Sequence, residues 1–157
     1  MTAARPIRVV SLAAHTDLIP QLVEAFADEW PSWAARTSRE EIARGFDSAA
    51  AGSLPQVFVA LDGERVAGSI ALRPWFDDVP MNETPWVRGL LVLPPYRGGP
   101  AYRLLAHAAE NAARSLGYGT LYAATTSIEA LIVRRGWEVF RRFERDGEAF
   151  AWLRKAL

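Results

Sequence analysis

The segment at residues 90–103 carries the residue types and spacing that most clearly indicate chemistry, and it reads LLVLPPYRGGPAYR. An apolar run there passes through two adjacent glycines, Gly98 and Gly99, into a pattern typical of a long helix. Free backbone N–H groups and the positive dipole end of a helix N-terminus bind anions such as phosphates. Arg97 and Arg103 would add charge for a phosphate or pyrophosphate group. A tight strand-to-helix connection that needs two glycines is the alternative interpretation of the same residues.

Other familiar sites are missing from the sequence. No Gly-Lys-Ser/Thr follows the glycines, as a P-loop requires, and the dinucleotide motif G-x-G-x-x-G is absent. The chain has no cysteine, which excludes disulfides, thiolate metal sites and a cysteine nucleophile. His15 and His107 are isolated in the sequence, so we expect surface positions for both and no metal site.

Composition narrows the class of protein further. The 157 residues include 18 Lys+Arg and 18 Asp+Glu, and half of the residues are hydrophobic, as in an ordinary globular domain. The zero formal net charge disfavours a nucleic-acid or membrane surface, because the basic residues (all arginine except Lys155) are scattered. No run approaches the ~18 apolar residues of a membrane span, and the N-terminus lacks the apolar core of a secretory signal. We therefore expect a cytoplasmic protein.

Hydrophobic spacing predicts the elements that would position this segment. Predicted strands cover residues 7–12, 56–61, 65–72, 86–93, 120–125, 137–143 and 148–153. Predicted helices cover residues 17–30, 38–51, 100–116 and a short stretch after Thr126 that ends at Gly136. Ser38 and Glu41 have capping-box spacing, and Asp62-Gly63 and Asp146-Gly147 are typical hairpin turns. In the third helix the predicted apolar stripe is Leu104, Ala108, Ala112 and Leu116.

The predicted element order is β-α-α-β-β-β-α-β-α-β-β, without repeats or linkers. This order favours a mixed α/β (α+β) fold with a mostly antiparallel sheet and one strand–helix–strand unit in the middle. We expect residues 1–157 to form a single domain.

In this order, two pieces of sequence resemble the GNAT superfamily of acyl-CoA-dependent N-acetyltransferases. Residues 84–99 contain V-x-P-x-Y-R-G, and residues 129–139 contain R-R-G-W-E-V. The resemblance covers nearly the whole chain. It implies the GNAT fold, acetyl-CoA as co-substrate, and a primary amine on a small molecule or peptide as the acceptor.

The resemblance also implies a cofactor site. In such proteins the strand ending at Leu93 separates from the strand ending at Thr125, and pantetheine lies between them. Main-chain groups of Leu90, Leu91 and Val92 match those that bond pantetheine and polarise the thioester carbonyl. Thr125 matches a position, often Asn, that bonds the CoA chain. The pyrophosphate turn begins at Arg97 and continues through Gly98, Gly99, Pro100, Ala101, Tyr102 and Arg103.

Three residues depart from the family pattern. Pro100 and Tyr102 stand where the family has two glycines, and proline lacks an N–H donor. Each lost charge-assisted bond costs about 1.5–3 kcal/mol, so cofactor affinity could fall about tenfold to a hundredfold. Ile132 replaces a tyrosine that protonates the leaving thiolate in many relatives. Possible substitutes for that tyrosine are Tyr96, Tyr102, Tyr122 and Thr126.

Fewer residues point to the acceptor site. Asp28, Glu29 and Glu83 are candidate bases, although a solvated helix end and a loop carboxylate are the simpler interpretations. Aromatic residues in the two flanking loops could form a wall for the acceptor or pack into the core, namely Trp30, Trp33, Trp75 and Phe76.

Two functions therefore stand against each other. The first is an N-acetyltransferase in which the amine attacks acetyl-CoA directly within a ternary complex. The second is a non-catalytic module for ligand sensing or protein association, which the departures at Pro100, Tyr102 and Ile132 favour. The closing hairpin at residues 137–153 could supply a homodimer interface.

Overall fold

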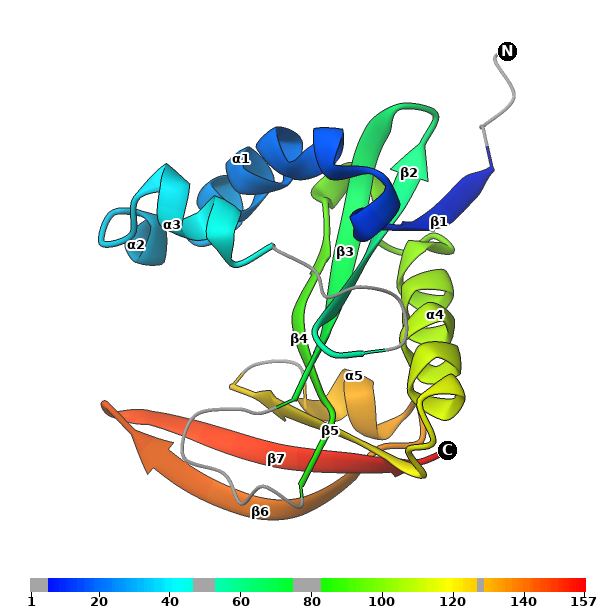
Figure 1. Ribbon diagram of the computed structural model, residues 1–157. Coiled ribbons are helices and arrows are strands. Elements are labelled where there is room, and N and C mark those ends of the chain that lie inside the picture. The colour runs from blue at the N-terminus through cyan, green and yellow to red at the C-terminus, as the bar shows by residue number, and fades with distance from the viewer. Residues whose placement is uncertain (1–5, 47–52, 75–82, 127–128) are drawn as a thin grey trace.

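The computed structural model describes residues 6–46, 53–74, 83–126 and 129–157, which form a seven-stranded sheet with helices on both faces (Figure 1). The strand order is β1-β2-β3-β4-β5-β7-β6, and only β4 and β5 run parallel. The predicted mixed fold with a mostly antiparallel sheet is confirmed. The strands are β1 (Ile7–Ser11), β2 (Gln56–Asp62), β3 (Arg65–Arg73), β4 (Trp86–Val92), β5 (Thr120–Thr125), β6 (Glu138–Arg145) and β7 (Glu148–Ala156).

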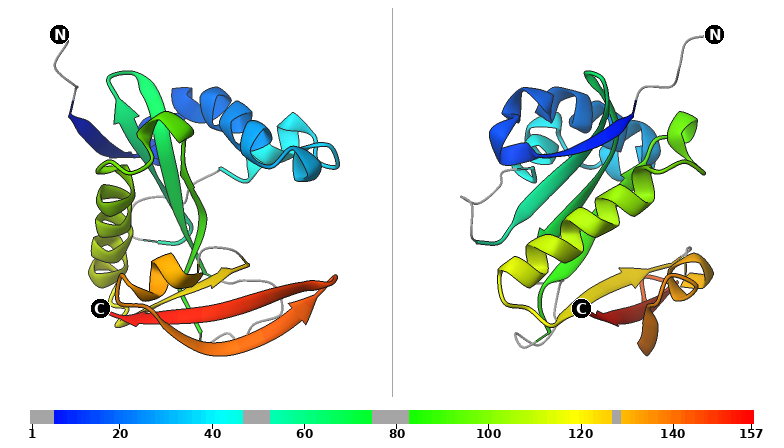
Figure 2. Two further views of the ribbon diagram at one scale, coloured as in Figure 1. Left: turned by 180° about the vertical axis from the view of Figure 1, so that it is seen from behind. Right: turned by 90° about the vertical axis from the view of Figure 1, so that its right-hand side faces the viewer.

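Helices α1 to α3 cover one face of the sheet, whereas α4 lies on the other face with α5 at its lower end (Figure 2). None of the described helices is long and apolar enough to span a membrane. The helices are α1 (Ile19–Glu29), α2 (Pro31–Ala34), α3 (Arg39–Arg44), α4 (Ala101–Ser115) and α5 (Glu129–Val133).

Local sequence signals account for several element ends. The Ser38–Glu41 capping box forms as predicted, with Glu41 N–H donating to the Ser38 hydroxyl at 3.1 Å. The turn between β6 and β7 uses left-handed backbone at Asp146 and Gly147, which matches the twist of the two strands. The prediction for α3 was too long, because the helix ends at Arg44 with Gly45 as its C-cap; residues 47–52 lie outside the described residues.

The buried face of α4 corrects the sequence prediction by one position. Leu104, Ala108, Ala112 and Leu116 are only half-buried. The face against the sheet consists of Ala101, Leu105, Ala109 and Ala113, each at most 1% exposed. Both stripes have helical spacing, so the sequence does not distinguish them. The contact with β3 decides which stripe is buried, because Leu105 packs so close to β3 that a Cβ at Gly68 would lie 3.2 Å from Leu105 Cδ1. The absence of a side chain at Gly68 lets α4 approach the sheet closely.

Strands β4 and β5 separate soon after they begin. Register pairs join them only at Trp86–Tyr122 and Val87–Ala123. Beyond these pairs the strands diverge, so the sheet opens into a β1–β4 part and a β5–β7 part (Figures 1 and 2). The predicted separation of these two strands is thus present, and it places the C-terminal half of β4 beside an opening rather than beside a neighbouring strand.

Candidate active site

Strand β4 contains a bulge at the point where it leaves β5. Ala71 of β3 pairs with Arg88 and Ser69 pairs with Leu91, so Gly89 and Leu90 together face a single β3 residue. Gly89 has φ +58°, and a Cβ there would lie 3.4 Å from the Phe26 ring. The buried Ser69 hydroxyl donates to the Gly89 carbonyl at 3.2 Å. The bulge turns backbone groups out of the ladder and towards the opening.

Gly89 was missed in the sequence analysis, although the sequence contains a signal for it. A glycine inside an apolar strand pattern typically marks a bulge or a close approach of backbone. Of the three residues beside it that the sequence analysis singled out, Leu90 lines the opening, whereas Leu91 is 3% exposed and packs into the core beneath α1.

The glycine turn after β4 leads directly into α4. Gly98 has φ +80°, and the first intrahelical bond of α4 runs from Leu104 N–H to Pro100 O. Within the described residues no acceptor is present for the N–H groups of Gly98, Ala101, Tyr102 and Arg103. Gly99 differs from them, because its N–H donates to Tyr96 O at 3.4 Å. Four donors at a helix start thus remain for an anion despite Pro100.

Arg97 is directed to α1 rather than along the turn. Its Nη2 contacts both carboxylate oxygens of Glu29 at 3.0 Å, and its Nε donates to Val92 O at 2.9 Å. From the sequence, Arg97 was predicted to bind phosphate and Glu29 was a candidate base for the acceptor. The structure joins the two residues in one ion pair.

A cavity of about 710 Å³ occupies the opening between β4 and β5. It reaches both faces of the sheet, since its walls include α4 and α5 on one side and the ends of α1 and α2 on the other. Among the predicted site residues, Glu29, Leu90, Tyr102 and Thr125 line the cavity. The lining also includes Phe26, Trp30, Trp33, Arg88, Gly89, Glu110, Thr126, Ile132 and Phe150.

On the α4 side, two charged contacts border the cavity. The Arg135 guanidinium, which follows α5, lies 4.1 Å from the centre of the Tyr102 ring. Burial raises the pKa of Tyr102, and Arg135 opposes this shift, so its hydroxyl is protonated at neutral pH. Deeper in the cavity Glu110 is 8% exposed and pairs with Lys155 at 2.5 Å. Tyr102 is therefore a partly buried side chain beside the glycine turn, with Arg135 packed on its ring.

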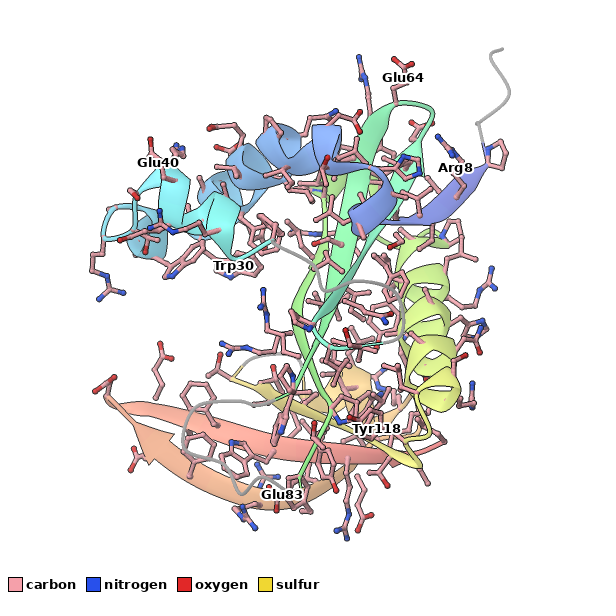
Figure 3. The ribbon with its side chains drawn as sticks, in the orientation of Figure 1. Arg8, Trp30, Glu40, Glu64, Glu83 and Tyr118 are labelled. Carbon is pink, nitrogen blue, oxygen red and sulfur yellow. The ribbon has the colours of Figure 1, made fainter. Side chains whose placement is uncertain are left out.

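The structure does not bring every candidate to the cavity. Glu83 bonds Arg141 at 3.2 Å, and Figure 3 shows it beside β6, at the opposite end of the molecule from α1. Tyr122 packs against Trp86, with ring centroids 5.4 Å apart, and does not line the cavity. Tyr96 bonds Asp62 at 3.0 Å and also lies outside the cavity lining. Sequence spacing alone could not show that these three side chains lie away from the cavity, because all three residues flank segments that do contribute to it.

The acceptor side of the cavity has aromatic walls. Trp30 and Trp33 remain 38% and 39% exposed, and Figure 3 shows Trp30 facing the space below α1. Phe150 of β7 lines the cavity on the other side. Trp75 and Phe76, the other members of the predicted wall, lie outside the described residues. No group of three or more acidic or histidine side chains suited to a metal ion occurs in the part of the chain that the structure describes.

These features define a protein that can hold a long anionic cofactor in a split sheet and a second substrate on the opposite face. The chain belongs to the acetyltransferase (GNAT) family, whose model matches residues 19–134. It is an acyl-CoA-dependent N-acetyltransferase with acetyl-CoA as co-substrate. The split, the bulge and the unpaired N–H groups of the turn fit that co-substrate.

Known proteins of this kind share the fold at low sequence identity. The chain is 25% identical over 136 residues to S-alkylcysteine N-acetyltransferase of Bacillus subtilis, covering 82% of this chain and 72% of that protein. A GCN5-related N-acetyltransferase from Kribbella flavida matches with TM-score 0.76 and 18% identity over 96% of this chain and 98% of that chain. An aminoglycoside 6′-N-acetyltransferase complexed with coenzyme A matches with TM-score 0.73 and 15% identity, covering 95% of this chain and 96% of that chain.

Proposed function

We propose that this protein transfers the acetyl group of acetyl-CoA to a primary amine by direct attack of the amine within a ternary complex. The observation that supports this most strongly is the cavity through the split sheet. Its α4 side suits the cofactor and its α1 side suits the acceptor, and the two sides meet at the bulge. Two substrates bound from opposite faces can therefore react without a covalent enzyme intermediate.

The chemistry of the transfer requires little from acid catalysis. The co-substrate supplies an acetyl thioester. The neutral amine attacks its carbonyl carbon, a C–N bond forms, the C–S bond breaks, and the electron pair stays on sulfur as the thiolate of CoA. A thiol with a pKa near 8.5 leaves readily as the thiolate, so Ile132 in place of tyrosine is compatible with turnover. Tyr102 and Thr126 are the two predicted substitutes that line the cavity.

Backbone groups of this chain would hold the co-substrate. We assign the bulge at Gly89 and Leu90, continuing to Leu91 and Val92, to pantetheine and the thioester carbonyl. The turn from Gly98 to Arg103 is assigned to the pyrophosphate, because its unpaired N–H groups point out of a helix start. Thr125 borders the cavity on the β5 side and is assigned to the CoA chain.

Of the three candidate bases for the proton that leaves the amine, Asp28 is exposed and, like Glu83, does not line the cavity, so Glu29 remains. Glu29 lines the cavity on the acceptor side, and the proton would pass to it directly or through water. The ion pair with Arg97 occupies both of its oxygens, which limits its strength as a base. A homodimer through the β6–β7 hairpin is a further prediction, independent of this chemistry.

Calorimetric titration with acetyl-CoA tests whether the protein binds the cofactor, with desulfo-CoA and adenosine diphosphate as comparisons. Thiol release measured with a panel of primary amines tests the transfer. The name of the Bacillus relative makes an S-alkylcysteine a first acceptor for that panel. Micromolar binding and amine-dependent thiol release support the proposal. Binding without amine-dependent release would favour the ligand-sensing alternative, and no binding at millimolar ligand would overturn the cofactor assignment.

A further inference from the structure

The ring of Phe26 lies directly against the bulge in β4. Phe26 is buried on α1, and its side chain is part of the cavity lining. A Cβ on Gly89 would lie 3.4 Å from Phe26 Cζ and 3.5 Å from Cε2, and among the described residues beyond its chain neighbours no other atom comes within 4 Å of that point. Since such a Cβ would already be in van der Waals contact, no ligand atom fits between Gly89 and the ring. The outer edge of the ring therefore closes the space over the bulge on the α1 side.

Two other aromatic rings hold Phe26 in this position. Its ring makes edge contacts with Trp30 and Phe46, with ring centroids 5.1 Å and 4.8 Å apart. Phe46 is buried and belongs to the same core cluster as Phe26. A ring packed in this way cannot swing aside without opening a void in the core.

The backbone on the other side of this contact is held as well. Ser69 is buried in β3, and its hydroxyl donates to the Gly89 carbonyl at 3.2 Å. This hydrogen bond ties the bulge to the neighbouring strand, so Gly89 cannot move away from the ring without losing it. The contact between Phe26 and the bulge is therefore fixed from both sides.

The rest of the cavity leaves more room than this point does. Its volume is about 710 Å³, and its acceptor half, on the α1 side, is bordered by the exposed rings of Trp30 and Trp33. An acyl chain that turned towards these rings would occupy the space that the amine needs. The size of the acyl group is therefore limited locally, at the bulge, and not by the total volume of the cavity.

The proposed acetyl transfer places the thioester carbonyl at this bulge, and the present inference rests on that proposal. The three substituents of a thioester carbon lie in one plane. With the oxygen on the bulge and the sulfur on the α4 side, the acyl chain is directed to the α1 side, towards Phe26. The ring then meets the first carbon of the acyl chain, and each further carbon has to displace the ring or the bulge.

We propose that Phe26 determines which acyl group the protein accepts, admitting acetyl and excluding longer chains. Insertion of methylene groups against a packed wall is unfavourable, because side chains and backbone must shift to make room for them. One methylene in an apolar pocket changes specificity by about tenfold to two-hundredfold. Phe26 is thus the residue that sets the specificity for the donor, by direct contact with its acyl group.

A series of acyl-CoA thioesters tests the inference on the wild-type protein. Calorimetry gives the Kd for free CoA, acetyl-CoA, propionyl-CoA and butyryl-CoA, and thiol release with an accepted amine gives kcat/KM. We expect butyryl-CoA to bind at least about tenfold more weakly than acetyl-CoA, and kcat/KM to fall at least about tenfold with each added methylene. Butyryl-CoA that binds as tightly as acetyl-CoA would overturn the inference.

A variant then assigns the size limit to Phe26. Phe26→Leu removes the ring atoms that face Gly89 and keeps an apolar side chain in the core. We expect the ratio of Kd for butyryl-CoA to Kd for acetyl-CoA to fall to near one, while the Kd for free CoA stays at the wild-type value. Phe58→Leu is the matched control, because Phe58 of β2 packs in the other core cluster, outside the cavity lining, and its ratio should not change. A wild-type ratio in a folded Phe26→Leu protein would refute the role of Phe26.

The outcomes separate this inference from the proposed function. If neither CoA nor acetyl-CoA binds, the cofactor assignment itself fails. If thioesters of every chain length bind alike, cofactor binding stands and the acyl-size inference alone fails. The Kd series needs no acceptor, so it decides the inference even when no amine of the panel releases thiol. If a melting curve shows that Phe26→Leu does not fold, the wild-type series still decides whether acyl size is limited.

Discussion

The two halves of the cavity are built by different means. We assign the cofactor half mainly to residues 89–103, one continuous segment whose backbone N–H groups would bind the ligand; of these residues Gly89, Leu90 and Tyr102 line the cavity. The acceptor half draws on side chains from α1, α2, β4 and β7, which are distant in sequence. Backbone recognition tolerates changes such as Tyr102, because the N–H groups remain whatever the side chain. Recognition by side chains can change with each substitution, so we expect the acceptor half to set which amine is acetylated.

One ion pair joins the two halves. Arg97 begins the turn that we assign to phosphate, and Glu29 ends α1. Arg97 Nη2 contacts both carboxylate oxygens of Glu29, and Arg97 Nε donates to Val92 O.

The largest effect is expected where both halves meet. Gly89→Val places a β-branched side chain at φ +58° and against Phe26, which costs roughly 1–2 kcal/mol of strain and shifts the bulge. A displacement of about 1 Å can cost about a hundredfold in rate, so we expect kcat/KM to fall by more than about a hundredfold. Steady-state kinetics with a melting curve checks this. Gly119→Ala is the control, because a Cβ there meets no atom within 4 Å.

Glu29→Gln tests whether the acceptor half supplies the base. We expect kcat to fall by about a hundredfold, the low end of general-base contributions, because Arg97 already holds both oxygens. Single-turnover rates measured against pH report the effect. Glu24→Gln is the control on the same helix, since Glu24 is exposed, pairs with the exposed Arg39 and does not line the cavity. An unchanged kcat would mean that the proton leaves to water and that Glu29 only positions Arg97.

Arg135→Met tests whether the Arg135 guanidinium contributes to binding the phosphates of CoA. Its guanidinium stacks on Tyr102 beside the phosphate turn, so removing the charge should raise the Kd for CoA about tenfold, the loss of one charge-assisted contact. The Kd for pantetheine, which lacks the phosphates, should change far less. Calorimetry with both ligands measures the difference. The neighbouring Arg134→Met serves as the control, and equal weakening of both ligands would contradict a role with phosphate.

Trp33→Ala should give the smallest effect. Trp33 is 39% exposed on the cavity, so removing it takes away acceptor surface and little of the core. We expect KM for an aromatic acceptor to rise about fivefold, as expected for loss of part of an apolar contact, while the Kd for acetyl-CoA stays constant. Leu131→Ala, a similarly exposed residue outside the cavity lining, is the control. A parallel rise in the Kd for acetyl-CoA would show that Trp33 contributes to cofactor binding as well as to acceptor binding.

The sequence by itself determined the features that depend on local chemistry. Strand and helix positions followed from apolar spacing, the α3 start from Ser38 and Glu41, and the closing turn from Asp146-Gly147. The glycine turn that leads into α4 was predictable for the same reason, because its four unpaired N–H donors belong to residues close together in the chain. Even the bulge had a local signal in Gly89, which the sequence analysis did not use.

Only the tertiary structure decided which side chains meet. It placed the buried stripe of α4 one position along, paired Arg97 with Glu29, and directed Glu83 and Tyr122 away from the cavity. It also brought aromatic residues of α1, α2 and β7 to the lining of one cavity. Such contacts join residues far apart in the chain, and their partners depend on how the sheet twists and splits. No local pattern of residues encodes these contacts, so the sequence named single members of the proposed acceptor site, such as Glu29, Trp30 and Trp33, without showing how they are grouped.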